Sequence, residues 1–416
     1  MPDDDWNRER AKPVAVGPPR RRATRAERIR AAHGRRKRRI ATGFSLAVLV
    51  AVVVGAVFLG SKLWHTVFGA GTTDYAGDGV SDVVIEVHDG DSTTAIGQTL
   101  QDHKVVATVK AFVDAAEGNS AISAIQPGFY KVRTEIPASN AVARLADPQS
   151  RVGKLVIPEG RQLDDIQDLR TNAVTDGIFT LISKATCVNL DDHRHCVSVA
   201  DLRQVAGTAV PSTLSVPDWA ANAVKVLGND HRRLEGLISP GTWNIDPAGS
   251  PQQILSTLIG ASATLYAQGG LLDTTNSLNM SPYQILTVAS LVQREAKPQD
   301  FAKVARVIYN RLAERRTLEF DSTVNYPLDR QEVATTDADR AQKTPWNTYV
   351  HEGLPATPIC SPGQPALTAA EHPAAGDWLY FVTIDMQGTT LFTRDYQQHL
   401  ANIELAKRNG VLDSAR

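Results

Sequence analysis

Residues 281–296 read SPYQILTVASLVQREA, and this stretch predicts a helix inside a folded domain. Ser281 is a good N-cap, and Pro282 is a good first helical residue. Apolar side chains recur at spacings of three and four, so one face of the helix is expected to be buried. Glu295 continues this apolar face at the end of the helix. The stretch therefore predicts a buried helix that presents a carboxylate.

The pKa of Glu295 is predicted to be raised. Partial burial and the negative end of the helix dipole both favour the protonated form of its carboxyl group. A carboxyl group that is protonated near neutral pH can act as the general acid in glycosidic cleavage. In the alternative interpretation, Glu295 turns to solvent or pairs with Arg294 or Lys297.

Downstream of this stretch, the pattern predicts a helix over residues 301–313, a strand over 378–382 and a last helix over 397–408. Between them lie polar loop clusters, such as DSTVNY at 321–326 and WNTY at 346–349. Loops of this composition can line a sugar groove by ring stacking and hydrogen bonding. They are equally compatible with well-formed turns.

Upstream, residues 83–157 are predicted to form a compact unit of α and β elements. Strands are expected at 83–87, 128–132 and 153–157, with helices near 92–100, 106–116 and 137–145. The first strand, its HDGD turn and the next helix resemble the first half of a LysM module, a small β/α fold that binds N-acetylglucosamine. A turn with capping Asp and Ser is also common by itself. A domain boundary is expected at IPEG, residues 157–160, before a helical pattern over residues 163–169.

Cys187 and Cys196 enclose two histidines in the segment CVNLDDHRHC. Zinc prefers such ligands, but four of them crowded into this segment cannot easily complete a tetrahedron. A disulfide that closes a short loop is therefore favoured over a metal site. Cys360 is then left unpaired.

Residues 40–60, IATGFSLAVLVAVVVGAVFLG, contain no charged side chain and predict a transmembrane helix. At 1.5 Å per residue, the run is about 30 Å long, enough to cross a bilayer. The basic run at residues 35–39 places the N-terminus in the cytoplasm by the positive-inside rule. We therefore expect a single-pass protein of the cell membrane, with a flexible linker over 61–82 and its folded part outside the cytoplasm.

The chain has 416 residues, enough for two or three folded units. Residues 1–39 carry a net charge of +9 and the remainder −10, so the total of −1 hides a basic tail and an acidic body. A basic tail beside a span indicates topology, and nucleic-acid binding is not expected. The bulk composition of 42% hydrophobic and 21% charged residues excludes collagenous, wholly disordered and multi-span classes.

Taken in order, several segments resemble the endolytic murein transglycosylases, a YceG-like family. The carrying segments are ASLVQREA around Glu295, YNRL at 309–312, FDSTVNY at 320–326, WNTY at 346–349, GLPATPICSPG at 353–363, HP at 372–373, LYFV at 379–382, VIPEG at 156–160 and LEGLISPGTW at 234–243. The resemblance implies an α+β protein with a cytoplasmic tail (1–39), a transmembrane helix, a LysM-like unit (83–157) and a mixed α/β catalytic domain (158–416). Many relatives have Glu at the position of Gln293 and Pro at the position of Ser322.

The resemblance also implies an activity, cleavage of the β-1,4 bond between N-acetylmuramic acid and N-acetylglucosamine with formation of a 1,6-anhydro end. It implies no cofactor and no metal, and it places the catalytic carboxyl group at Glu295. The residues expected to bind sugar or support the transition state are Asn310, Asp321, Thr323, Tyr326, Asn347, Tyr349 and His372. The implied partners are peptidoglycan strands, the membrane and the penicillin-binding proteins of the cell-wall synthesis complex.

Two alternatives remain at this point. In the first, the protein is a hydrolytic muramidase in which Asp321 activates water or acts as the nucleophile, because hydrolytic glycosidases usually use two carboxyl groups. In the second, it is a non-catalytic scaffold that binds the cell wall through the LysM-like unit.

Overall fold

The structure is a computed structural model that describes residues 73–168, 171–273, 278–328, 330–331 and 335–411. These residues lie in one compact unit, Thr73–Arg416. The unit contains two hydrophobic cores, one built from residues between 85 and 145 and one from residues between 155 and 370. Helices and short strands contribute to both cores, so the predicted mixture of α and β elements is confirmed.

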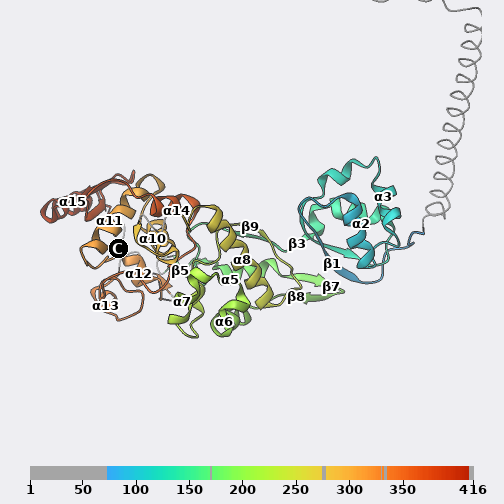
Figure 1. Cartoon of the computed structure of the whole chain (residues 1–416), viewed down its shortest axis with the longest axis horizontal. Helices are drawn as coiled ribbons and strands as arrows, with labels where there is room; N and C mark the ends of the chain where they lie inside the picture. The colour runs from blue at the N-terminus through green and yellow to red at the C-terminus, as the bar shows by residue number, and fades with distance from the viewer. Residues whose placement is uncertain (1–72, 169–170, 274–277, 329, 332–334, 412–416) are drawn as a thin grey trace, which may run out of the picture. The chain divides into compact units, whose positions relative to one another are not determined.

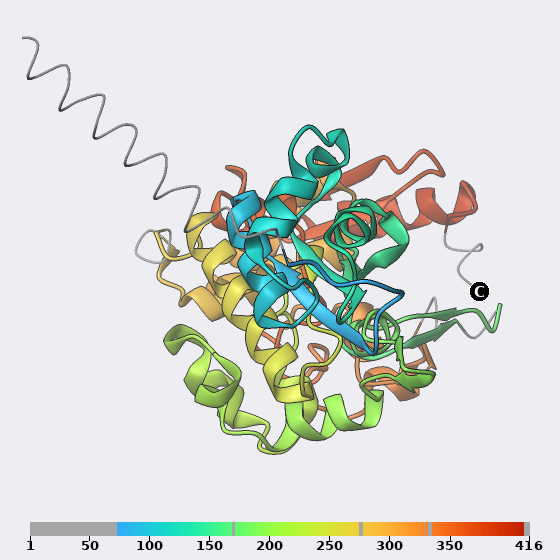
Figure 2. The ribbon, with the colours of Figure 1, turned by 90° about the vertical axis from the view of Figure 1, so that its right-hand side faces the viewer.

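The first core lies between a three-stranded antiparallel sheet and three helices (Figures 1 and 2). Alternate residues of the strands, such as Ile85 and Tyr130, point inward against Phe112 of a helix. The strands, in sheet order, are β1 (Asp82–Val87), β2 (Gly128–Arg133) and β3 (Arg151–Val152). The helices are α2 (Thr93–Asp102), α3 (Val109–Ala116) and α4 (Ala138–Ala146).

The strand predicted to close this unit belongs to the second core instead. β4 (Lys154–Ile157) pairs with β9 (Gly241–Asn244), and it buries Leu155 and Ile157 in the second cluster. The change of core occurs at Gly153, whose φ of 69° favours glycine. A Cβ atom there would lie only 1.9 Å from the carbonyl oxygen of Ile245. The two cores therefore meet at a glycine that no larger residue can replace without a backbone shift.

Helices form most of the second core (Figure 1). They are α5 (Ile178–Ala185), α6 (Val199–Thr208), α7 (Asp218–Val226), α8 (Pro251–Gln268), α10 (Pro282–Glu295), α11 (Phe301–Ala313), α12 (Asp321–Asn325), α13 (Asp337–Arg340), α14 (Gln364–Glu371) and α15 (Tyr396–Arg408). β11 (Tyr380–Thr383) and β12 (Thr390–Thr393) form a separate hairpin. The helices predicted over 301–313 and 397–408 match α11 and α15.

Two local predictions are wrong. The helix expected over residues 163–169 is absent from the described part of that range, where β5 (Ile166–Asp168) pairs with β6 (Val174–Thr175) and β10 (Arg330–Gln331). Long-range pairing with β10 overrides the local helical pattern there. The polar cluster that begins at residue 321, expected to be non-helical, contains the short helix α12.

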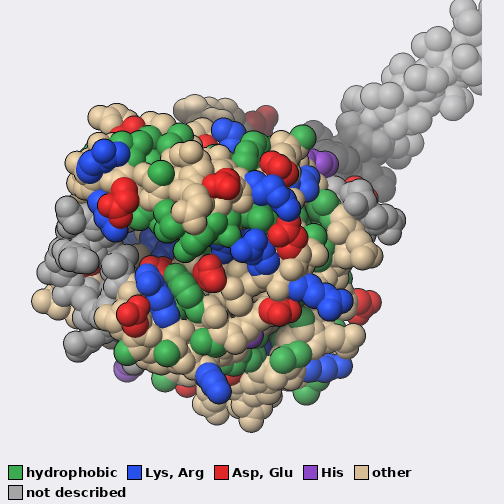
Figure 3. Space-filling view, turned by 90° about the vertical axis from the view of Figure 1, so that its left-hand side faces the viewer, with side chains coloured by type: hydrophobic (Ala, Val, Ile, Leu, Met, Phe, Trp, Pro, Cys, Tyr) green, Lys and Arg blue, Asp and Glu red, His purple; other side chains and the backbone are tan. Residues whose placement is uncertain are grey.

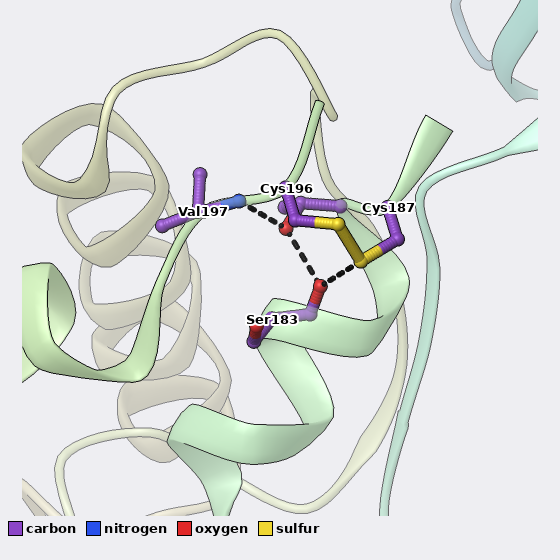
Figure 4. Close-up of a disulfide and its surroundings, with 5 residues drawn as sticks. Ser183, Cys187, Cys196 and Val197 are labelled. Carbon is purple, nitrogen blue, oxygen red and sulfur yellow. Dashed lines mark hydrogen bonds between the residues drawn. A yellow bond between two sulfur atoms is a disulfide. The ribbon is translucent and has the colours of Figure 1, made fainter. Parts of the chain in front are cut away.

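Cys187 and Cys196 form a disulfide that closes the hairpin of β7 (Val188–Leu190) and β8 (His193–His195) (Figure 4). Beyond the hairpin, the Val197 N–H donates to Thr186 Oγ1 at 3.0 Å. In the chain-entropy account, a disulfide across so short a loop stabilises the fold by about 2–3 kcal/mol. Among the described residues, no cluster of three or more potential metal ligands is present.

No helix within the described residues has both the length and the apolar character needed to cross a membrane. The span predicted over residues 40–60 lies outside the described residues, as do the basic tail and the first part of the linker. The last residues of the predicted linker belong to the fold, because the Val80 N–H donates to the Thr134 carbonyl at 3.0 Å and the Thr134 N–H donates to Ser81 at 2.9 Å.

Candidate active site

Helix α10 positions Glu295 at the end of a buried element. Ser281 is the N-cap and Pro282 occupies the first turn, as the sequence predicts, and the structure adds a reciprocal capping box between Ser281 and Gln284. The apolar face, including Val288 and Val292, is fully buried. The helix ends at Glu295, and the next residue is extended. The carboxyl group therefore projects from a rigid element, which suits a group that must be held in place.

Two backbone N–H groups of the segment that contains ICSPG donate hydrogen bonds to side chains of α10. The Ile359 N–H donates to Ser290 Oγ at 3.0 Å, and the Gly363 N–H donates to Gln293 Oε1 at 2.9 Å. Gln293 therefore serves the packing of α10 against the start of α14. Gln293 thus has a structural role, whereas the carboxyl group of Glu295, two residues later, is not used in this contact.

Glu295 is partly exposed and lies beside the start of α12. Desolvation raises its pKa to about 7, and the negative charge of Asp321 acts in the same direction. Interactions with the hydroxyl and backbone amide of Ser322, and with the charge of Arg294, limit the rise. Near neutral pH, both protonation states of Glu295 are therefore accessible, as a group that first gives and then takes a proton requires.

In contrast to Glu295, Asp321 is kept in its ionised form. Its Oδ1 accepts hydrogen bonds from Thr335 Oγ1 at 2.7 Å, the Tyr349 hydroxyl at 2.7 Å and Arg340 Nε at 3.2 Å, and its Oδ2 accepts from Arg340 Nη2 at 3.0 Å. Burial opposes ionisation, but these donors outweigh it and lower the pKa of Asp321. The site thus contains one carboxyl group with a raised pKa and one kept ionised, a division typical of acid and electrostatic roles.

Asn347 organises the donors around Asp321. Its side-chain amide donates to the carbonyl oxygens of Arg340 at 3.0 Å and Gln342 at 2.6 Å, and its Oδ1 accepts from the Tyr349 N–H at 2.9 Å. The Arg340 guanidinium lies 5.2 Å from the centre of the Tyr349 ring. Asn347 is itself buried, so its contribution to the site is to hold Arg340 and Tyr349.

Thr323 and Tyr326 also lie in this region, but their polar atoms face the protein. The Thr323 hydroxyl donates to the Phe320 carbonyl at 2.7 Å and is 2.9 Å from Thr348 Oγ1. The Tyr326 hydroxyl donates to Glu235 Oε2 at 2.8 Å. Both residues are buried and fix α12 and its flanks.

Asn310 and His372 make other contacts. The Asn310 side chain donates to the carbonyl oxygens of Gly376 and Trp378, at 3.3 and 2.9 Å, and holds the loop before β11. His372 is exposed at the C-terminal end of α14. Of the predicted site residues, the structure thus brings together Glu295, Asp321 and Tyr349, with Asn347 behind them.

Several residues of this region were not predicted from the sequence. Arg340 and Thr335, both bound to Asp321, lie in a segment without a recognisable pattern. Glu235 is 1% exposed, and desolvation raises its pKa to about 8 despite hydrogen bonds from the Leu163 N–H and Tyr326. It lies within LEGLISPGTW, and that resemblance was the signal that could have identified it.

Comparisons with known proteins agree on one family. The model of the YceG-like family matches residues 85–405. The endolytic murein transglycosylase of Bacillus subtilis is 28% identical over 326 residues, covering 77% of this chain and 84% of that protein. The protein of that name in Streptococcus pneumoniae is 25% identical over 336 residues, and the match covers 77% of this chain but 58% of the pneumococcal protein. A crystal structure of a YceG-like protein from Listeria monocytogenes has a TM-score of 0.49 and 26% sequence identity, covering 77% of this chain and 98% of that one.

Proposed function

Because the chain belongs to the YceG-like family, we propose that it cleaves peptidoglycan glycan strands as an endolytic lytic transglycosylase. The observation that carries the proposal is the carboxyl pair, in which Glu295 has a pKa of about 7 and Asp321 stays ionised. The curated relatives that are named for this activity support it. The substrate bond is the β-1,4 linkage between N-acetylmuramic acid and N-acetylglucosamine.

In the proposed reaction, Glu295 acts twice. Its protonated form gives a proton to the glycosidic oxygen while the bond from that oxygen to C1 of muramic acid breaks. The C6 hydroxyl of the same sugar then attacks C1, and the Glu295 carboxylate takes the hydroxyl proton. The product carries a 1,6-anhydro bridge, no water is consumed, and Glu295 returns to its acid form. The negative charge of Asp321 would stabilise positive charge that develops on the sugar.

The hydrolytic alternative is less compatible with the site. A nucleophile or general base uses a lone pair of a carboxylate oxygen, and Asp321 already accepts three hydrogen bonds at Oδ1 and one at Oδ2, which lower its nucleophilicity. The lowered pKa of Asp321 also makes it a weak base. These contacts favour an electrostatic role for Asp321.

We further propose a setting outside the cytoplasm, with residues 40–60 as a membrane anchor and the N-terminus inside. The charge pattern around this run and a disulfide in the folded part support that topology. The unit that contains β1–β3 is proposed to bind N-acetylglucosamine in the manner of a LysM module. An anchored enzyme of this kind would act on new glycan beside penicillin-binding proteins.

The test of the proposed function is mass spectrometry of the products that the purified full chain releases from peptidoglycan. Muropeptides that end in 1,6-anhydro-muramic acid, one water lighter than hydrolysis products, are expected. Reducing ends would instead assign a hydrolase. If the protein binds the wall but releases no product, the scaffold interpretation gains support.

The pH dependence of cleavage is expected to follow Glu295. Only its protonated form can start the reaction, so kcat/KM should fall about tenfold per pH unit above a midpoint near pH 7. A pH–rate profile with soluble glycan strands measures this midpoint. A fall that begins near pH 4.5, the ordinary value for Glu, would contradict the raised pKa.

A further inference from the structure

A pocket lies beside the segment that leads from α11 to Asp321. It has a volume of about 610 Å³, and its lining includes Arg315, Arg316, Glu352 and two tyrosines. Thr317 also lines it, and the four-residue step from there to Asp321 spans at most about 14 Å. On the side of α13 and α15 the surface is hollowed, with basic and acidic side chains among hydrophobic ones (Figure 3). A strand bound at Asp321 could therefore reach this pocket with an adjoining sugar.

Arg315 has an unusual backbone for its residue type. It follows the C-cap of α11 with a φ of 53°, a conformation that favours glycine. Its N–H donates to the Leu312 carbonyl at 3.1 Å, and the Arg316 N–H donates to the Arg311 carbonyl at 2.9 Å, the pattern of a Schellman motif. Glycine could therefore replace Arg315 without backbone strain.

Within the described residues, the Arg315 guanidinium has no ion pair and no side-chain hydrogen bond. Its neighbours differ in this respect. Arg311 donates to the carbonyl oxygens of Leu379 and Leu318, both at 2.7 Å, and Arg316 donates to the Tyr380 hydroxyl at 2.7 Å. Arg315 is therefore the arginine of this pocket that is free to bind an anion.

The other walls suit a sugar. Tyr396 is 53% exposed, and its ring lies 5.5 Å from the ring of Tyr380 and 6.4 Å from that of His399. Aromatic rings of this kind pack against the apolar face of a sugar. Glu352, on the same pocket, can accept hydrogen bonds from sugar hydroxyls or amide N–H groups.

We propose that this pocket binds a carboxylate of the glycan strand through Arg315, with the adjoining sugar against Tyr396. This inference rests on the proposed function. Two parts of the substrate carry carboxylates, namely the lactyl group of a muramic acid without its peptide, and the stem peptide. A guanidinium recognises either one by two parallel N–H donors.

The test measures binding, so that it does not depend on cleavage. In a full chain carrying Glu295→Gln, the Kd is measured for three muramic-acid tetrasaccharides, one with free lactyl carboxylates, one with stem peptides and one with amidated carboxylates. Arg315→Gly is compared with Asn279→Gly. Asn279 is the matched control because it is an exposed residue with a φ of 53° that lies outside both this pocket and the β1–β3 unit. Glycine suits both positions, so neither variant is expected to lower Tm.

Arg315→Gly should weaken binding of a carboxylate-bearing ligand about tenfold and leave the amidated ligand unchanged, because one charge-assisted contact is lost. Weaker binding of the tetrasaccharide with free lactyl carboxylates would assign the lactyl group as the ligand of Arg315. Weaker binding confined to the tetrasaccharide with stem peptides would assign the stem peptide. Equal Kd values for Arg315→Gly and Asn279→Gly on every ligand would overturn the proposal. The proposal would also be overturned if Arg315→Gly weakened binding of the amidated tetrasaccharide as much as binding of the carboxylate-bearing ones. Because binding is read directly, a protein that binds but forms no anhydro product would refute the proposed function and leave this inference standing.

Discussion

Replacing Glu295 with Gln is expected to lower the rate of glycan cleavage by about 10²–10⁴-fold. The amide has nearly the same shape, so the packing of α10 should persist, but it can neither give a proton to the glycosidic oxygen nor take one from the C6 hydroxyl. The release of 1,6-anhydro ends, followed by mass spectrometry, measures the effect. Binding of glycan strands should change little, because the ground-state contacts remain.

A matched control is Glu371→Gln. Glu371 is 5% exposed, and burial together with the charge of Asp273 raises its pKa to about 7, as for Glu295. It lies at the end of α14, away from α12. We expect near wild-type cleavage from this variant, because a raised pKa without the neighbouring Asp321 does not make a catalytic site. If Glu295→Gln cleaves at the rate of the control, the assignment of Glu295 is wrong.

The sequence predicts those parts of the fold that depend on neighbouring residues. The capping box and apolar face of α10 are local, so its bounds and the position of Glu295 follow from residues 281–296 alone. The pairing of β4 with β9 joins segments far apart in the chain, and no local pattern encodes it. The wrong helix over 163–169 has the same origin, because β10 supplies the pairing that makes β5 a strand.

The site shows the same division. Asp321 and Tyr349 could be nominated because polar residues in loops suggest function, and their hydroxyl–carboxylate contact is present in the structure. Arg340 could not be nominated, since its role exists only when α13 folds against α12. Tyr326 was predicted to face the sugar, whereas its hydroxyl bonds to Glu235, a residue 91 positions earlier. The direction of a side chain depends on such distant partners, and the sequence pattern does not contain it.

Replacing Asp321 with Asn is expected to lower cleavage by about 10–100-fold and to shift the pH profile. The amide nitrogen of Asn cannot replace Oδ2 as the acceptor for Arg340 Nη2, whereas its oxygen can still accept from Thr335 and Tyr349, so the Arg340 side chain should lose part of its fixed position. Removal of the negative charge should also lower the pKa of Glu295, which that charge now raises. The alkaline fall in kcat/KM should therefore begin at a lower pH than in the wild-type protein.

The product and the pH profile together separate the two roles of Asp321. If it stabilises charge and positions α12, the residual product of Asp321→Asn keeps its 1,6-anhydro end and the midpoint moves to lower pH. If it activates water or acts as the nucleophile, cleavage should nearly vanish in a folded protein, and the wild-type product should be a reducing end. Asp201→Asn, which removes an exposed carboxylate in the first turn of α6, controls for a general loss of charge. A pH midpoint that stays unchanged in Asp321→Asn would contradict the electrostatic coupling with Glu295, because that coupling requires the two carboxyl groups to sense each other.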